Sequence, residues 1–117
     1  MARILIVEPH PEVRDLLVRI VERLGHVGVR LEEGELAHAA ADAALLEPSD
    51  ADGLELGREL RARGMPLVCL SIHPKSAETD ALEPAAYLLK PFVLHELEAA
   101  IHAALEPTPG SPALERA

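Results

Sequence analysis

Polar side chains capable of chemistry stand at the ends of four short apolar segments. Glu8 and Glu47 each follow such a segment, Ser71 ends a third, and Lys90 follows a fourth. Two carboxylates, a hydroxyl and an ammonium in one site would suit ion pairing, cation binding or phosphoryl chemistry. Lysine is scarce in this chain, with two residues against nine arginines, and Lys90 therefore points to a requirement for a compact point charge.

The segments that carry these residues have the pattern of buried parallel strands. Apolar runs occupy residues 3–7, 27–31, 43–46, 66–71 and 86–89. The runs are mostly continuous rather than alternating, which is typical of strands covered on both faces. They predict five strands.

Segments with helical spacing separate the runs. The clearest is 11–24, where apolar residues recur every three or four positions, with Pro11 near the start and Gly25 past the end. Residues 53–63, with Asp52 as the N-cap, and residues 93–105 have similar patterns. Residues 35–41 predict a short Ala-rich helix or turn, and 74–83, with few apolar anchors, predict a weak or irregular helix.

The alternation of strands and helices predicts the α/β class. We expect a flavodoxin-like, doubly wound, five-stranded parallel sheet of order 2-1-3-4-5 in a three-layer α/β/α arrangement. Residues 1–106 form one domain in this interpretation, and the Pro-, Gly- and Ser-rich residues 107–117 form a flexible tail. Because the carboxyl ends of parallel strands share one edge, Glu8, Glu47, Ser71 and Lys90 should meet there.

Composition excludes several classes of function. The chain has 117 residues and a net charge of −9, which argues against direct binding to nucleic acid. No apolar run approaches the roughly 18 residues of a membrane span. The single cysteine, Cys69, cannot form an internal disulfide, so we expect a cytoplasmic protein with Cys69 as an inert buried residue. The absence of Asn and Gln and the ten prolines resemble thermophile usage.

Three segments together resemble the receiver domain of two-component response regulators (CheY-like). They are "ILIVEPHPEVRDLL", "DGLELGRELRARGMPLVCLS" and "AYLLKPFVLHELEAAI", and the resemblance covers about residues 2–105. In that family an Asp after the third strand accepts a phosphoryl group from a histidine kinase, and two acids after the first strand help to bind Mg²⁺. The resemblance implies that Ser71 and Lys90 match the residues that contact the phosphoryl group, and that Tyr87 matches the switch aromatic.

Two departures from the family pattern concern its reactive residues. The acidic pair is replaced by Glu8 and Pro9, and Glu47 stands in place of the phosphoacceptor Asp. Pro9 supplies no side-chain oxygen, and the carboxylate of Glu47 would lie about 1.5 Å further out than that of Asp. Since phosphoryl transfer depends on positioning at that scale, we expect Mg²⁺-dependent phosphorylation to be absent or impaired. Glu47 could instead pair directly with Lys90.

We therefore predict an atypical, stand-alone, non-enzymatic receiver-like domain of two-component (phosphorelay) signalling that acts through protein–protein interaction. By resemblance, its partner would be a histidine kinase or output protein. The partner would dock on the face of the family's fourth helix, fifth strand and fifth helix (74–83, 86–89 and 93–105 here), which could also support a homodimer. No cofactor is expected, and Mg²⁺ is doubtful.

Two alternatives remain open from the residues alone. The first is a genuine phospho-accepting receiver that uses Glu47, or Asp50 if the alignment shifts. The second is a metal- or small-molecule-binding module at the same edge. Glu8 and Glu47 are weak metal candidates, and His10 and His73 also follow strands, but no tight ligand spacing supports such a site.

Overall fold

The computed structural model describes residues 1–31, 40–49 and 51–106. Five parallel strands form one sheet in the order β2-β1-β3-β4-β5, which confirms the predicted topology. The strand bounds follow the apolar runs closely: β1 Arg3–Val7, β2 Val27–Arg30, β3 Ala43–Leu46, β4 Leu67–Ser71 and β5 Ala86–Leu89. The strand order reverses between β1 and β3, and this switch point is where sites form in such sheets.

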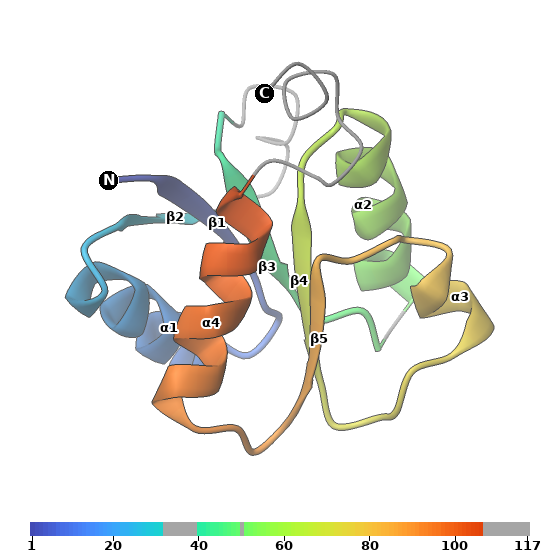
Figure 1. The fold of residues 1–117 in the computed structure, drawn as a ribbon. Helices are drawn as coiled ribbons and strands as arrows, with labels where there is room; N and C mark the ends of the chain where they lie inside the picture. The colour runs from blue at the N-terminus through green and yellow to red at the C-terminus, as the bar shows by residue number, and fades with distance from the viewer. Residues whose placement is uncertain (32–39, 50, 107–117) are drawn as a thin grey trace.

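Helices cover both faces of the sheet (Figure 1). The described helices are α1 Pro11–Arg23, α2 Ala51–Ala62, α3 Ala77–Asp80 and α4 Leu94–Leu105. Helices α1 and α4 lie on one face, and α2 lies on the other. Every residue of β3 and β4 is buried, because helices shield both surfaces of the central strands.

Two apolar cores hold these layers together. The first core joins α1 and α4 to the sheet, and its large members are Ile4, Ile6, Leu17, Val21, Leu45, Leu70, Leu97 and Ile101. The second joins α2 and the segment after α3 to the opposite face, and its large members are Leu5, Leu46, Leu60, Leu67 and Leu82. Alternate residues of each strand enter opposite cores, so every central strand is fixed from both sides and its carboxyl end is held rigidly.

Several local predictions are corrected or sharpened by the structure. Asp52 is not the N-cap of its helix, because α2 begins at Ala51 and places Asp52 in the first turn, where a carboxylate favours the positive end of the helix dipole. Gly25 ends α1 with a φ of 93°, a conformation that side chains disfavour. The irregular segment predicted at 74–83 contains only the one-turn helix α3, capped by Ser76.

Some predicted features fall outside the described residues. These are most of the Ala-rich segment 35–41, the alternative acceptor Asp50, and the tail 107–117. Within the described part of the chain, no helix has the length and apolar character needed to cross a membrane.

Candidate functional site

The carboxyl ends of β1, β3, β4 and β5 bring Glu8, Glu47, Ser71 and Lys90 to one edge of the sheet. Backbone hydrogen bonds fix each strand end, since Glu47 N donates to Val7 O at 3.0 Å and Lys90 N donates to Ser71 O at 2.8 Å. Glu8, Glu47 and Ser71 are all buried. Burial of three polar side chains at one edge requires that each of them has a hydrogen-bond partner.

The ammonium of Lys90 lies between the two carboxylates. Its Nζ is 2.9 Å from Glu8 Oε1 and 2.9 Å from Glu47 Oε2. The exposed fractions of the side chains are 1% for Glu8, 8% for Glu47 and 21% for Lys90. The Glu47–Lys90 ion pair anticipated from the sequence is therefore present, and Glu8 adds a second carboxylate to it.

Each remaining carboxylate oxygen also accepts hydrogen bonds. Glu8 Oε2 accepts from the backbone N–H of His10 at 3.2 Å and lies 3.0 Å from His10 Nδ1. Glu47 Oε1 accepts from the backbone N–H of Ser49 at 2.9 Å and from the Ser49 hydroxyl. All four oxygens of the two acids thus have donors from the protein, which is the condition for burying carboxylates at tolerable cost.

The electrostatics of the cluster favour the charged forms. Burial raises the pKa of Glu8, but hydrogen bonds from Lys90 and His10 together outweigh it, so the pKa lies below its ordinary value of 4.5. Burial lowers the pKa of Lys90, but hydrogen bonds to Glu8 and Glu47 and the charges of both carboxylates raise it above 10.5. The cluster therefore keeps Lys90 as an ammonium and Glu8 as a carboxylate across the neutral pH range.

Hydroxyl groups continue this network toward β4 and β5. Ser71 Oγ accepts from the backbone N–H of His73 at 3.0 Å and lies 2.9 Å from Ser49 Oγ. Tyr87 is half-buried and donates its hydroxyl proton to His73 O at 2.7 Å. Sequence reasoning missed Ser49. Its position two residues after Glu47, within a turn, was the available signal, because short hydroxyl side chains commonly bond in such turns.

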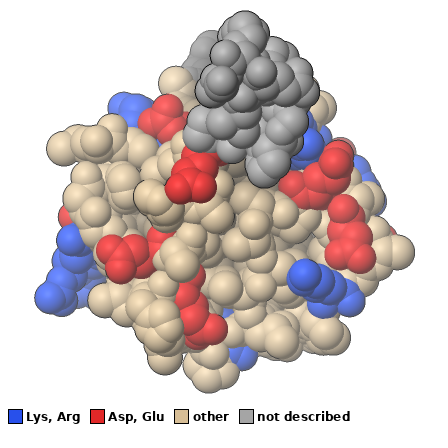
Figure 2. All heavy atoms as spheres, in the orientation of Figure 1, with Lys and Arg blue, Asp and Glu red and all other residues tan. Residues whose placement is uncertain are grey.

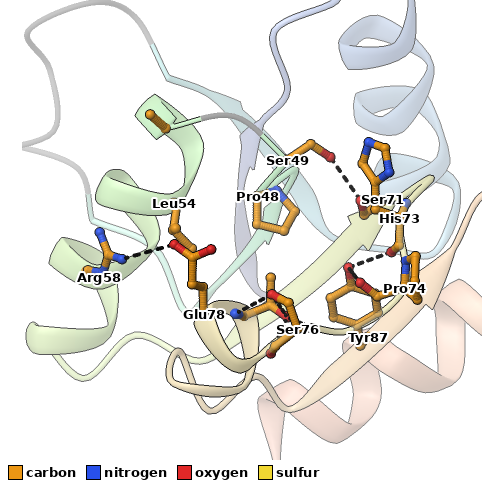
Figure 3. Close-up of a pocket in the computed structure, with 12 residues that line it drawn as sticks. Pro48, Ser49, Leu54, Arg58, Ser71, His73, Pro74, Ser76, Glu78 and Tyr87 are labelled. Atoms are coloured by element: carbon orange, nitrogen blue, oxygen red, sulfur yellow. Dashed lines mark hydrogen bonds and ion pairs between the residues drawn. The ribbon is translucent and has the colours of Figure 1, made fainter.

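A cavity of about 460 Å³ opens beside this hydroxyl network, between α2, α3 and the ends of β4 and β5 (Figure 3). Twelve residues line it: Pro48, Ser49, Ala51, Leu54, Arg58, Ser71, His73, Pro74, Ser76, Glu78, Thr79 and Tyr87. Arg58 and Glu78 are close to each other in this lining, with 4.0 Å between Nη2 and Oε2, and both are exposed. Sequence reasoning did not predict this cavity, because it depends on how the chain turns after β3 and β4.

The carboxylates do not fit a Mg²⁺ ion as the family resemblance would require. Pro9 offers no side-chain oxygen, and Lys90 occupies the space between Glu8 and Glu47 at hydrogen-bonding distance from both. A second cavity of about 210 Å³ is lined by Glu8, Glu47 and Asp52, but also by Arg14, whose positive charge opposes a metal ion. Among the described residues no group of three or more His, Cys, Asp or Glu could hold a metal.

The histidine and cysteine candidates are accounted for in simpler ways. His10 contacts Glu8, whereas His73 belongs to the hydroxyl side of the rim. Cys69 is fully buried in β4, and its burial, together with the charge of Glu47, raises the pKa of the thiol to about 11. Such a thiol is unreactive near neutral pH, as expected from the sequence.

The sequence is similar to those of bacterial transcriptional regulatory proteins. The chain is 35% identical over 127 residues to the transcriptional regulatory protein TcrA of Mycobacterium tuberculosis, covering 97% of this chain and 50% of that protein. It is 33% identical over 123 residues to a probable transcriptional regulatory protein of Picosynechococcus, covering 89% of this chain and 49% of that protein. The chain thus spans about half the length of these curated relatives. No family model matches it.

Several solved structures have a fold similar to that of this chain. The receiver domain of a modulated diguanylate cyclase from Desulfovibrio desulfuricans is 25% identical, with a TM-score of 0.74 over 90% of this chain and 94% of that one. The chemotaxis protein CheY4 of Vibrio cholerae has a TM-score of 0.77 at 20% identity, covering 90% of this chain and 99% of that one. The receiver domain of the Pseudomonas aeruginosa sensor histidine kinase PA1611, solved with Mg²⁺ in its active-site cleft, has a TM-score of 0.75 at 23% identity, covering 89% of this chain and 97% of that one. The chain therefore has the fold of the CheY-like receiver domains, and its sequence similarity to regulatory proteins agrees, at a general level, with two-component signalling.

Proposed function

We propose that this receiver domain transmits signals through protein–protein contacts without forming an acyl phosphate at Glu47. The observation that carries the proposal is the ammonium of Lys90, held at 2.9 Å from both Glu8 and Glu47. By family resemblance, Lys90 would contact the phosphoryl group of an activated receiver. Here carboxylates of the protein itself already engage it.

The arrangement of Glu47 supports this proposal over phosphorylation of the same carboxyl. Nucleophilic attack needs a free carboxylate oxygen, and both oxygens of Glu47 are engaged, one by Lys90 and one by Ser49. The usual Mg²⁺, which neutralises the incoming phosphoryl charge, has no place that fits between the carboxylates. In the proposed role, Ser71 and Tyr87 keep their structural positions without sensing a phosphoryl group.

Phosphorylation chemistry tests the proposal directly. The purified protein is incubated with Mg²⁺ and acetyl phosphate and then examined by intact mass, with and without hydroxylamine, which cleaves acyl phosphates. We expect no hydroxylamine-sensitive phosphoryl group. A Mg²⁺-dependent, hydroxylamine-sensitive gain of one phosphoryl group, mapped to Glu47 or Asp50, would favour the alternative of a genuine phospho-accepting receiver.

The contact surface in this proposal is the face made by α3, β5 and α4. Figure 2 shows that this side of the molecule is largely uncharged, with scattered acids and with Lys and Arg mainly at its margins. Leu89, Val93 and Leu94 are each more than half exposed there. Exposed aliphatic side chains on a weakly charged face suit a protein partner, such as a histidine kinase or an output protein, or a second copy of the chain.

Oligomeric state separates these partners. If the face mediates a homodimer, light scattering should give twice the monomer mass, and Leu94→Asp should return the protein to a monomer. A monomer at all concentrations would leave a different protein as the occupant of this face.

A further inference from the structure

We propose that Ser49 is a phosphoryl-acceptor residue, with Glu47 as the base that receives its proton. The inference builds on the proposed function, because it gives Glu47 a role other than acceptor. The family resemblance gives no role to the hydroxyl of Ser49. The phosphoryl donor in this inference is a high-energy acyl phosphate.

The contacts of Ser49 have the geometry of an activated nucleophile. Its hydroxyl is hydrogen-bonded to Glu47 Oε1, and Lys90 Nζ holds the other oxygen of that carboxylate at 2.9 Å. A nucleophile within reach of a base, with the base oriented by a third group, is the arrangement that activates serine hydroxyls. A carboxylate also accepts the hydroxyl proton of the substrate in protein kinases.

Access distinguishes Ser49 from the other hydroxyls of the rim. Ser49 is exposed and lines the 460 Å³ cavity, which is large enough for a small acyl phosphate. Ser71 is only 1% exposed and already accepts a hydrogen bond from His73. Ser76 is exposed in the same cavity, but its hydroxyl caps α3 and contacts Thr79 rather than a carboxylate.

The cavity also offers positive charge to a donor. Arg58 stands on its wall, and its contact with Glu78 is loose at 4.0 Å, with the two side chains 57% and 69% exposed. Such an exposed pair is weak, so the guanidinium can be shared with phosphoryl oxygens. The hydroxyl of Ser71, 2.9 Å from Ser49 Oγ, can donate to the same oxygens (Figure 3).

The proposed step balances as a phosphoryl transfer. The oxygen of Ser49 forms a bond to the phosphorus of the acyl phosphate, and the bond between that phosphorus and the carboxyl oxygen of the donor breaks. The donor leaves as a carboxylate, and the proton of Ser49 passes to Glu47. The product is a phosphoserine ester, which resists hydroxylamine, unlike an acyl phosphate.

A phosphoryl group on Ser49 would then act on the charged cluster. It adds nearly two negative charges and three acceptor oxygens next to Glu47. Lys90, which contacts Glu47 and has 21% of its side chain exposed, is a cation that those oxygens can compete for. The modification would therefore loosen the Glu47–Lys90 pair and relay the change to β5, which carries Lys90.

The test uses the whole chain and acetyl phosphate, followed by intact mass after hydroxylamine treatment and by fragment mapping. We expect a hydroxylamine-stable phosphoryl group at Ser49, with Ser76 of the same cavity as the internal control. Ser49→Ala should abolish the labelling. Glu47→Gln, which keeps the shape but not the base, should slow it at least about tenfold. Circular dichroism confirms that each variant is folded.

The possible outcomes distinguish the proposal for Ser49 from the proposed function. An unmodified mass, equal labelling of Ser76 and Ser49, or full-rate labelling of Glu47→Gln would overturn the proposal for Ser49 and leave the proposed function standing. A hydroxylamine-sensitive group on Glu47 would instead overturn both. Nuclear magnetic resonance spectra of the modified and unmodified protein then test whether the change reaches β5. If it does, the amide signals around Lys90 should shift.

Discussion

The carboxyl rim of the sheet has two halves that differ in how their polar groups are satisfied. In the half formed by β1, β3 and β5, Glu8, Glu47 and Lys90 pair with one another at 2.9 Å and are largely buried. In the half formed by β4 and the chain around α3, hydroxyls and backbone groups border an open cavity of about 460 Å³. One half is closed by internal charge pairing, whereas the other remains accessible.

This difference decides how much each half contributes to the stability of the fold. A buried charge needs its partner, because removing one member leaves the other uncompensated in a poorly hydrated place. A hydroxyl beside an open cavity can exchange its partner for water at small cost. Changes to the charged half should therefore alter folding, and changes to the hydroxyl half should alter mainly local structure and reactivity.

Removal of Lys90 is expected to have the largest effect. Lys90→Ala leaves two buried carboxylates without their counter-ion and should lower the free energy of unfolding by about 3 kcal/mol. Denaturant titration measures the loss, and amide shifts should extend over residues 85–95. Lys75→Ala, which changes an exposed lysine, is the matched control and should be nearly neutral. Equal effects from the two variants would contradict the comparison.

Acid should weaken the charged half before the hydroxyl half. The pKa of Glu8 is lower in the folded state than its ordinary value of 4.5, so its contribution to stability is complete above that pH. The contribution is lost as the pH falls below 4.5 and through the folded pKa. Denaturant midpoints measured between neutral and acid pH should fall less steeply for Glu8→Gln than for the original protein, whereas parallel curves would exclude this role for Glu8.

Alkali should act on the same cluster in the opposite sense. The pKa of Lys90 is raised above 10.5 in the folded state, so its contribution is complete below that pH and is lost as the pH rises through the folded pKa. The loss at high pH should disappear in Lys90→Met. If the variant keeps the full alkaline loss, another group is responsible.

Ser71→Ala should have a moderate effect. It removes a buried hydroxyl that accepts from the backbone N–H of His73, and the cost should be about 1 kcal/mol. Hydrogen exchange should quicken at His73 more than at Lys90. A larger loss than that of Lys90→Ala would reverse the order expected from the two halves.

Tyr87→Phe is expected to have the smallest effect. The phenolic hydroxyl donates to His73 O in a part of the rim that water reaches, so its loss should cost about 0.5 kcal/mol or less. Thermal unfolding measures this cost. Nuclear magnetic resonance should show amide shifts confined to the neighbourhood of His73 and Pro74. Shifts that extend to Glu8 and Lys90 would show that the two halves of the rim are coupled and would contradict the comparison.

The fold was predictable because its evidence is local and repeated. The continuous apolar run of Ala43–Leu46 indicates a buried strand, and the helical spacing of apolar residues in Pro11–Arg23 indicates a helix with one buried face. Both patterns can be seen within a short stretch of sequence. The start of α2 was misplaced, since Asp52 is an equally good residue for an N-cap and for a first turn. Helix boundaries depend on small energies that the residue pattern alone does not separate.

The candidate site was predictable only in part. Parallel strands require their carboxyl ends to share one edge, so the meeting of Glu8, Glu47 and Lys90 followed from the order of strands. The role of Ser49 did not follow, because its contacts with Glu47 and Ser71 depend on the path of a turn. The cavity beside it depends on the packing of α2 against the segment around α3.

The amino-acid sequence by itself determined which chemical groups stand at the strand ends. The apolar runs indicate the strands, and the alternation of strands with helices indicates a parallel sheet. Only the tertiary structure decided how those groups are partnered. Lys90 and Glu8 are 82 residues apart in the chain, and their contact exists because folding buries both and burial demands compensation of charge.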